Sequence, residues 1–170
     1  MIPRPDAAEV ASYYFTYIDQ VEGCEPLAVL SRQFDELVPW FSRISEEQSL
    51  QRYAPGKWSI RQVLNHITDT ERAFAFRALW FARGFDAPLP GYDQEIAAVG
   101  AEADSFPWSA HVEEFRSVRL STISLFANLP PAASSRAGIA SGNPFTVRAL
   151  AYIIPGHVAH HVRILRERYL

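Results

Sequence analysis

Apolar residues recur every three or four positions in several stretches of the chain, the spacing that places them on one face of an α-helix. The first long stretch lies between Pro26 and Gln48, and its stripe consists of Leu27, Leu30, Phe34, Leu37, Phe41 and Ile44. The second begins at Ser59, where Ser59 and Gln62 have the spacing of a capping box, and it ends at Gly84. These patterns predict two long helices with defined ends.

Two more long stripes and one short stripe complete the pattern. A third helix is predicted from Ser109 to Leu129, where two prolines follow it, and a fourth from Thr146 nearly to the C-terminus. Before the first long helix, an aromatic-rich stripe predicts one short helix; its residues are Val10, Tyr14, Tyr17 and Val21.

Residues 84–108 interrupt the helical pattern with three prolines and three glycines. A connection of this length is uncommon in a compact domain and is typical of a functional loop or of a crossover between distant ends of a bundle. No alternation of useful length predicts a strand. The sequence therefore predicts one all-α domain over residues 1–170, a four-helix bundle with a long connection between helices 2 and 3 and a short N-terminal helix.

Two histidines interrupt the apolar stripe of the last predicted helix. The stripe reads Val147, Leu150, Ile154, His157, His161 and Ile164. Because His157 and His161 are four residues apart, they lie on one face and their rings can converge. Two buried imidazoles repel each other when protonated and lack hydrogen-bond partners when neutral, whereas a shared metal ion satisfies both. The alternative is a hydrogen-bonded pair in the core.

His66 lies on the second long helix, where it can face the interior of the bundle. Together, His66, His157 and His161 predict a site for one divalent metal ion with one or two open positions, Zn²⁺ or Ni²⁺ first and Fe²⁺ as a further choice. For His66 alone, a hydrogen-bonded core histidine is the alternative. Asp69, three residues on, is a candidate to orient an imidazole or to act as a base.

Other residues near these histidines are weaker candidates. Arg77 has nearly the same helical angle as His66 but lies about 16 Å further along the axis. It could bind a substrate carboxylate only if the substrate is extended, and a surface ion pair with a glutamate is the expected alternative. Tyr92 and Asp93, in the long connection, are candidates to close over the metal. Val158 stands where a zinc protease needs its catalytic glutamate, and no Glu-x-x-His pair of a di-iron bundle occurs.

Composition narrows the classes of partner. The 170 residues carry a formal net charge of −3, so no broad basic field attracts nucleic acid. No apolar run approaches the roughly 20 residues of a membrane helix. The N-terminus lacks the apolar segment of a signal peptide, and Cys24 is the single cysteine. We therefore expect a cytoplasmic protein with a small-molecule substrate and with neither nucleic-acid nor membrane partners.

Several segments resemble the DinB/YfiT-like superfamily of metal-binding four-helix bundles, and the resemblance covers the chain from about Tyr13 to its end. They are residues 53–66 with the tryptophan before the cap, residues 69–72 together with Arg77, residues 88–94, and residues 148–161. The resemblance implies that His66, His157 and His161 are the metal ligands. Pro155, two residues before His157, departs from the pattern, and a bend there either tunes how the ligands converge or is merely tolerated.

The resemblance also implies two enzymatic classes. Members are similar to metal-dependent transferases that use a low-molecular-weight thiol, and others are described as metal-dependent hydrolases. A non-catalytic protein that binds a metal or a small ligand is the third alternative. Relatives commonly form homodimers, and spare aromatic residues could line such an interface; they are Tyr13, Tyr14, Phe15, Trp40, Trp80 and Trp108.

Overall fold

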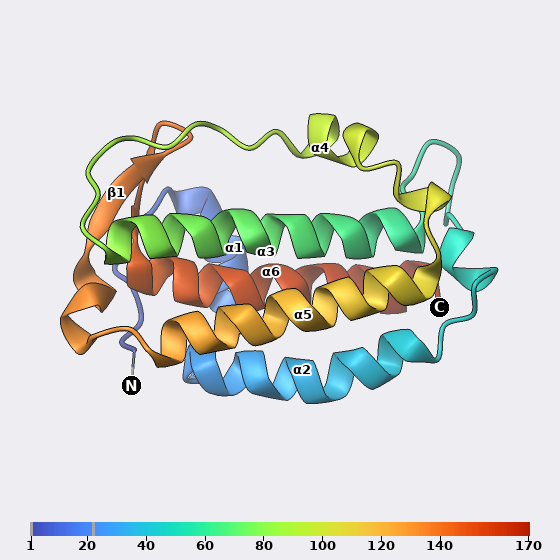
Figure 1. The fold of residues 1–170 in the computed structure, drawn as a ribbon, viewed down its shortest axis with the longest axis horizontal. Helices are drawn as coiled ribbons and strands as arrows, with labels where there is room; N and C mark the ends of the chain where they lie inside the picture. Colours follow the sequence, from blue (N-terminus) through green and yellow to red (C-terminus); the bar gives the residue numbers. More distant parts are fainter. Residues whose placement is uncertain (1, 22) are drawn as a thin grey trace.

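Four long helices lie side by side in the computed structural model, which describes residues 2–21 and 23–170 (Figure 1). They are α2 (Pro26–Ser42), α3 (Ile60–Ala82), α5 (Trp108–Ala127) and α6 (Val147–Arg168). Helix α3 packs against α5 and α6, and α2 packs against the same two helices on the other side. The four-helix bundle predicted from the apolar stripes is therefore confirmed.

The helix starts follow the capping signals in the sequence. The Ser59 hydroxyl accepts a hydrogen bond from the Gln62 backbone N–H at 3.1 Å, and the Gln62 side chain accepts one from the Ser59 N–H at 2.9 Å. Thr146 caps α6 in the same way, accepting from the Ala149 N–H at 3.1 Å. These bonds satisfy backbone donors that have no partner within the helix. The third long helix begins one residue before its predicted start.

The segments outside the four long helices form short elements. At the N-terminus, 3₁₀ turns at Ser12–Tyr14 and Asp19–Val21 flank the single-turn helix α1 (Phe15–Ile18), where one short helix was predicted. Further 3₁₀ turns lie at Gln48–Leu50 and Pro131–Ser135. No helix in the described part of the chain has a stretch long and apolar enough to cross a membrane.

The long connection runs outside α3 from one end of the bundle to the other, so that α3 and α5 point in the same direction (Figure 1). It contains the short helix α4 (Gln94–Gly100) and a 3₁₀ turn at Ala103–Ser105. The predicted crossover between helices 2 and 3 is therefore confirmed, and it passes over the face of α3 that faces away from α2.

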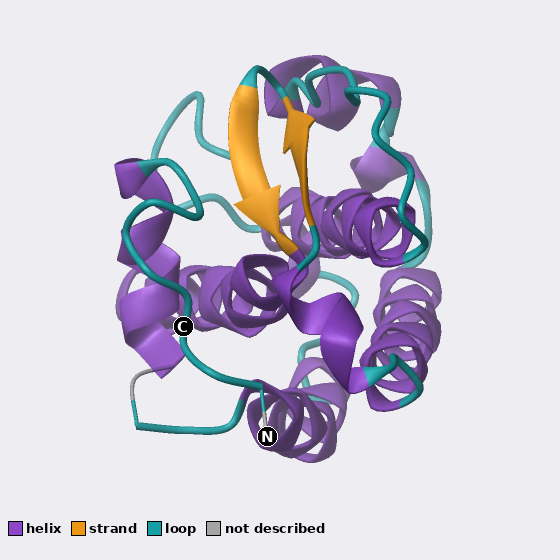
Figure 2. Ribbon diagram, turned by 90° about the vertical axis from the view of Figure 1, so that its left-hand side faces the viewer, coloured by secondary structure: helices purple, strands orange, loops and turns teal. Residues whose placement is uncertain are grey.

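A small antiparallel hairpin joins α5 to α6 (Figure 2). Its strands are β1 (Ala137–Ala140) and β2 (Asn143–Thr146), and the turn residues Ser141 and Gly142 both have positive φ. The expectation that the chain holds no strand was wrong, because four-residue strands are too short to produce a visible alternation. The hairpin approaches α3 so closely that a Cβ on Gly138 would lie 2.1 Å from the Phe81 ring.

The apolar core divides into two clusters along the bundle. One contains Phe81, Phe126 and Phe145 near the hairpin, and the other contains Phe41, Phe115 and Leu165 near the opposite end. Of the aromatic residues considered for a dimer interface, Trp108 is buried and its indole N–H donates to the Phe41 carbonyl, whereas Tyr13 is 63% exposed. The homodimer stays a prediction.

One buried arginine makes polar contacts that connect all four long helices. Arg119 of α5 pairs with both carboxylate oxygens of Glu71 on α3, at 2.9 and 2.8 Å, and donates to the Gln33 side chain of α2 at 2.8 Å. Gln33 in turn donates to the Pro155 carbonyl of α6 at 2.8 Å. Arg119 and Glu71 are almost fully buried, so each charge depends on the other for its stabilisation.

Replacing Glu71→Gln should therefore lower the free energy of unfolding by about 3–5 kcal/mol, because it leaves the Arg119 charge buried without a counter-charge. Urea denaturation followed by circular dichroism measures this loss. The matched control is Glu114→Gln, which removes an exposed ion pair with Arg72 between the same two helices and should cost less than about 1 kcal/mol. Equal losses in the two variants would contradict the assigned role of the buried pair.

Candidate metal centre

Three histidine side chains meet between the two apolar clusters, one from α3 and two from α6. The Nε2 atom of His157 lies 3.2 Å from that of His66 and 3.1 Å from that of His161. One ring nitrogen from each of the three residues lies within 4.8 Å of the other two. The structure thus brings together the three histidines that the sequence singled out.

The spacing of these nitrogens suits a shared metal ion. Ligand nitrogens 2.0–2.1 Å from a tetrahedral zinc ion lie roughly 3.3 Å from each other, close to the two distances around His157. Without a metal, the single proton on His157 Nε2 can serve only one of its two neighbours. The donor set could therefore hold one divalent ion, and no other cluster of this kind occurs in the described residues.

Burial keeps the imidazoles neutral. His66 and His157 are about 5% exposed, and His161 is half-buried. Burial lowers the pKa of His66 to about 4, and burial together with the neighbouring histidines lowers the pKa of His161 to about 3. The pKa of His157 is lowered well below its ordinary value, chiefly by burial. All three lone pairs are thus available for a metal at neutral pH.

Neighbouring side chains fix the orientation of the His66 ring. The Thr70 hydroxyl, one turn further along α3, lies 3.4 Å from His66 Nδ1, which directs Nε2 toward α6. The Trp58 ring packs on the imidazole with 5.0 Å between ring centroids. A metal-binding histidine is usually oriented through its second nitrogen in this way.

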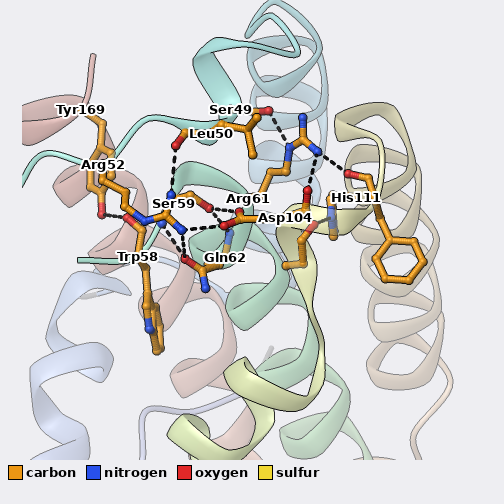
Figure 3. A network of polar contacts seen from close by, with 12 residues as sticks. Ser49, Leu50, Arg52, Trp58, Ser59, Arg61, Gln62, Asp104, His111 and Tyr169 are labelled. Atoms are coloured by element: carbon orange, nitrogen blue, oxygen red, sulfur yellow. Dashed lines mark hydrogen bonds and ion pairs between the residues drawn. The ribbon is translucent and has the colours of Figure 1, made fainter. Parts of the chain in front are cut away.

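A polar network at the start of α3 holds Trp58 in place (Figure 3). The Trp58 carbonyl accepts a hydrogen bond from the Tyr169 hydroxyl at 2.8 Å. The next residue, Ser59, donates to the Asp104 carboxylate at 2.5 Å, and Arg52 donates to the same carboxylate at 2.6 Å. Because Asp104 lies in the long connection, this network also anchors the crossover to the N-terminus of α3.

The N-terminal helix α1 covers the other side of the site. The Tyr17 ring packs edge-on against His157, with 5.2 Å between ring centroids. The backbone of Tyr17 lies against α6 at Gly156, where an added Cβ would lie 2.0 Å from the Tyr17 carbonyl oxygen. Helix α6 stays continuous through Pro155 and Gly156. The residue before His157 has to be a glycine because the Tyr17 backbone occupies the space that a side chain would need.

Two cavities adjoin the histidine cluster. The smaller, about 160 Å³, is lined by His66 and His157; the larger, about 340 Å³, is lined by His161. Gln94, at the start of α4, borders both cavities. Four tyrosines and Phe74 are among the residues that line the small cavity, and no aspartate or glutamate among the described residues lines it. Different histidines of the cluster therefore border the two cavities.

The remaining sequence candidates lie as follows. Asp69 accepts a hydrogen bond from Arg72 at 3.0 Å, and its role at the site stays a prediction. Tyr92 lines the small cavity, whereas Asp93 caps α4 through the N–H groups of Glu95 and Ile96. The contact of Tyr17 with His157 could not be predicted from the sequence, because local spacing carries no signal for the docking of α1 on α6.

The expectation for Arg77 was wrong. Its side chain is 5% exposed and donates to the Ser141 hydroxyl of the hairpin turn at 2.9 Å, instead of pairing with a glutamate on the surface. The cause is the hairpin, which the sequence pattern did not predict and which covers this end of α3.

Comparison with known proteins relates the chain to a family and to a solved structure. The DinB superfamily model matches residues 30–165. Among solved structures, the chain is similar to YfiT from Bacillus subtilis, described as a probable metal-dependent hydrolase with an unusual four-helix bundle topology. The TM-score is 0.67 at 16% sequence identity, over 97% of this chain and 90% of that chain, which is a likeness of fold. No curated protein matches the sequence.

The close approach of α1 to α6 makes Gly156 a sensitive position. Gly156→Ala should lower the free energy of unfolding by about 1–3 kcal/mol, because the new methyl group forces the Tyr17 backbone away from α6. Chemical denaturation measures this change. Gly100→Ala, also at a helical glycine but with no atom within 4 Å of the added Cβ, should be neutral or stabilising. A neutral Gly156→Ala would refute the tight packing of α1.

Proposed function

The chain belongs to the DinB superfamily, and we propose that it is a metal-dependent transferase that joins a low-molecular-weight thiol to a small electrophilic substrate. His66, His157 and His161 hold one divalent ion, Zn²⁺ or Ni²⁺ first and Fe²⁺ as a further choice. The observation that carries the proposal is the pair of cavities bordered by different histidines of the cluster, because a transfer between two organic molecules needs room for both.

The ligand set favours a catalytic over a structural metal. Structural zinc sites usually have four protein ligands, often cysteines, whereas the cluster in the described chain holds three histidines, and Cys24 is exposed and outside it. When bound, the ion supplies Lewis acidity that lowers the pKa of a thiol or a water molecule. The three neutral imidazoles add no negative charge, which favours an anionic partner such as a thiolate.

The protein's own residues divide the remaining tasks. Thr70 and Trp58 orient His66, and Tyr17 packs over His157 and limits the access of water to it. We assign the thiol to the larger cavity, beside His161, where Lys57 and Trp58 are among the lining residues and can contact a charged or planar group. The electrophile occupies the smaller, aromatic cavity beside His66 and His157.

Hydrolysis is the second candidate, since the similar fold of YfiT is described with that activity. A hydrolase needs a general base near the metal. Asp69 is paired with Arg72. Among the described residues, the larger cavity has one acidic lining residue, Glu95, and the smaller cavity has none. The absence of a carboxylate from the small cavity favours the transferase.

Purified without chelator, the protein should carry about one divalent ion per chain, and His157→Ala should reduce this at least about tenfold, because it removes the central ligand. Elemental analysis of the folded proteins measures the ratio. His160→Ala is the matched control, since His160 adjoins His161 on α6 but lies outside the cluster. If the wild-type protein neither contains metal nor gains thermal stability on metal addition, the three histidines are a hydrogen-bonded core cluster and not a metal site.

The metal-loaded protein should conjugate a low-molecular-weight thiol to chloro-dinitrobenzene, and His66→Ala should abolish the activity. The assay uses a panel of small thiols and follows the thioether product by absorbance. Hydrolysis of p-nitrophenyl acetate, dependent on the metal and independent of thiol, would instead support the hydrolase. Thiols that neither react nor alter the spectrum of the Co²⁺-substituted protein would overturn the transferase proposal.

A further inference from the structure

Arg77 is a buried cation without an acidic partner among the described residues. The two other buried arginines of the chain pair with glutamates: Arg61 with Glu46, and Arg119 with Glu71. The Arg77 guanidinium contacts the Ser141 hydroxyl and lies over aromatic rings, 5.6 Å from the Phe74 centroid and 5.7 Å from that of Phe145. Burial of an uncompensated charge destabilises a fold, so a functional reason for the charge is expected.

The guanidinium lines the same small cavity that His66 and His157 border. The other polar side chains that line this cavity in the described part of the chain carry hydroxyl or amide groups and no carboxylate; they are four tyrosines, Thr70, Gln94 and Ser141. Burial raises the pKa of Tyr14 and lowers that of Arg77, and neither change removes the guanidinium charge at neutral pH. The cavity thus has one positive end, one end at the histidine cluster, and an aromatic middle.

We propose that this cavity binds a small organic acid, whose carboxylate pairs with Arg77 while its reacting end lies at the histidine cluster. The assignment of the reacting end rests on the proposed function. The assignment of the carboxylate rests on the cavity itself, since a planar guanidinium matches a planar carboxylate with two parallel hydrogen bonds.

The charge and size of the cavity restrict the acid further. A single cation balances a monoanion, whereas a phosphate dianion would keep half its charge inside an aromatic cavity. The volume of about 160 Å³ corresponds to roughly five water molecules at liquid density. Because Arg77 is three helical turns beyond His66, the carboxylate lies several bonds from the reacting atom. An extended monocarboxylic acid satisfies these conditions.

The test compares 4,4,4-trifluorobutyrate with its neutral amide by fluorine NMR titration, in metal-loaded and in chelator-treated protein. The acid should bind at least about tenfold more tightly than the amide, corresponding to one charge-assisted pair. The preference should persist without metal, because Arg77 and not the ion holds the carboxylate. Inorganic phosphate, titrated as a competitor, should displace the acid only weakly.

Variants separate binding from folding. Arg77→Met should reduce the affinity for the acid to that for the amide, while its melting temperature stays unchanged or rises, since a buried unpaired charge is removed. Arg77→Lys should restore part of the preference. Arg83→Met, at an exposed arginine just after α3, is the control and should bind like wild type.

Several results would overturn the proposal. They are equal affinity for acid and amide in the wild-type protein, acid binding that requires metal and survives Arg77→Met, or tighter binding of phosphate than of the acid. The wild-type comparison needs no variant, so it decides the question even if Arg77→Met fails to fold. Because metal content is measured separately, failure of the carboxylate site is distinguishable from failure of the metal site.

Discussion

The buried contacts of Arg119 are the constraint on which the geometry of the site depends. One guanidinium joins α5 to Glu71 on α3 and to Gln33 on α2, and Gln33 extends the connection to the Pro155 carbonyl on α6. An apolar interface tolerates sliding of one helix along another, whereas a buried ion pair does not, because a shift leaves charges unpaired. Pro155 lies two residues before His157, so the same contacts that set the helix register also set the height at which the α6 histidines meet α3.

Much of the fold and the histidine cluster could be predicted from the sequence, because both depend on spacing within single helices. Ser59 and Thr146 cap their helices through residues three positions away, and such signals are local. His157 and His161 were conspicuous because they interrupt an apolar stripe, and their four-residue spacing fixes a common face. His66 needed the family resemblance, since one polar residue on a buried face has many ordinary explanations.

What the sequence did not reveal depends on contacts between distant segments. Arg77 was placed correctly on the face of His66, yet its burial follows from the hairpin turn at Ser141, 64 residues away in sequence. The docking of Tyr17 over His157 depends on a close backbone approach at Gly156, and a glycine in a helix gives no indication of which segment it admits. Both features shape the small cavity, so the sequence located the histidine cluster but not the cavity beside it.

The distribution of charge supports the proposal of an anionic substrate. Both acidic residues of α3 are paired with arginines, Asp69 with Arg72 and Glu71 with Arg119, and neither lines the small cavity. A divalent ion held by three neutral imidazoles would keep its full charge, and Arg77 adds another positive charge in the same buried space. Such a concentration of positive charge is unfavourable without anions. A carboxylate at Arg77 and a thiolate at the metal would supply them, whereas a neutral ester and water would leave the excess uncompensated until a proton is lost.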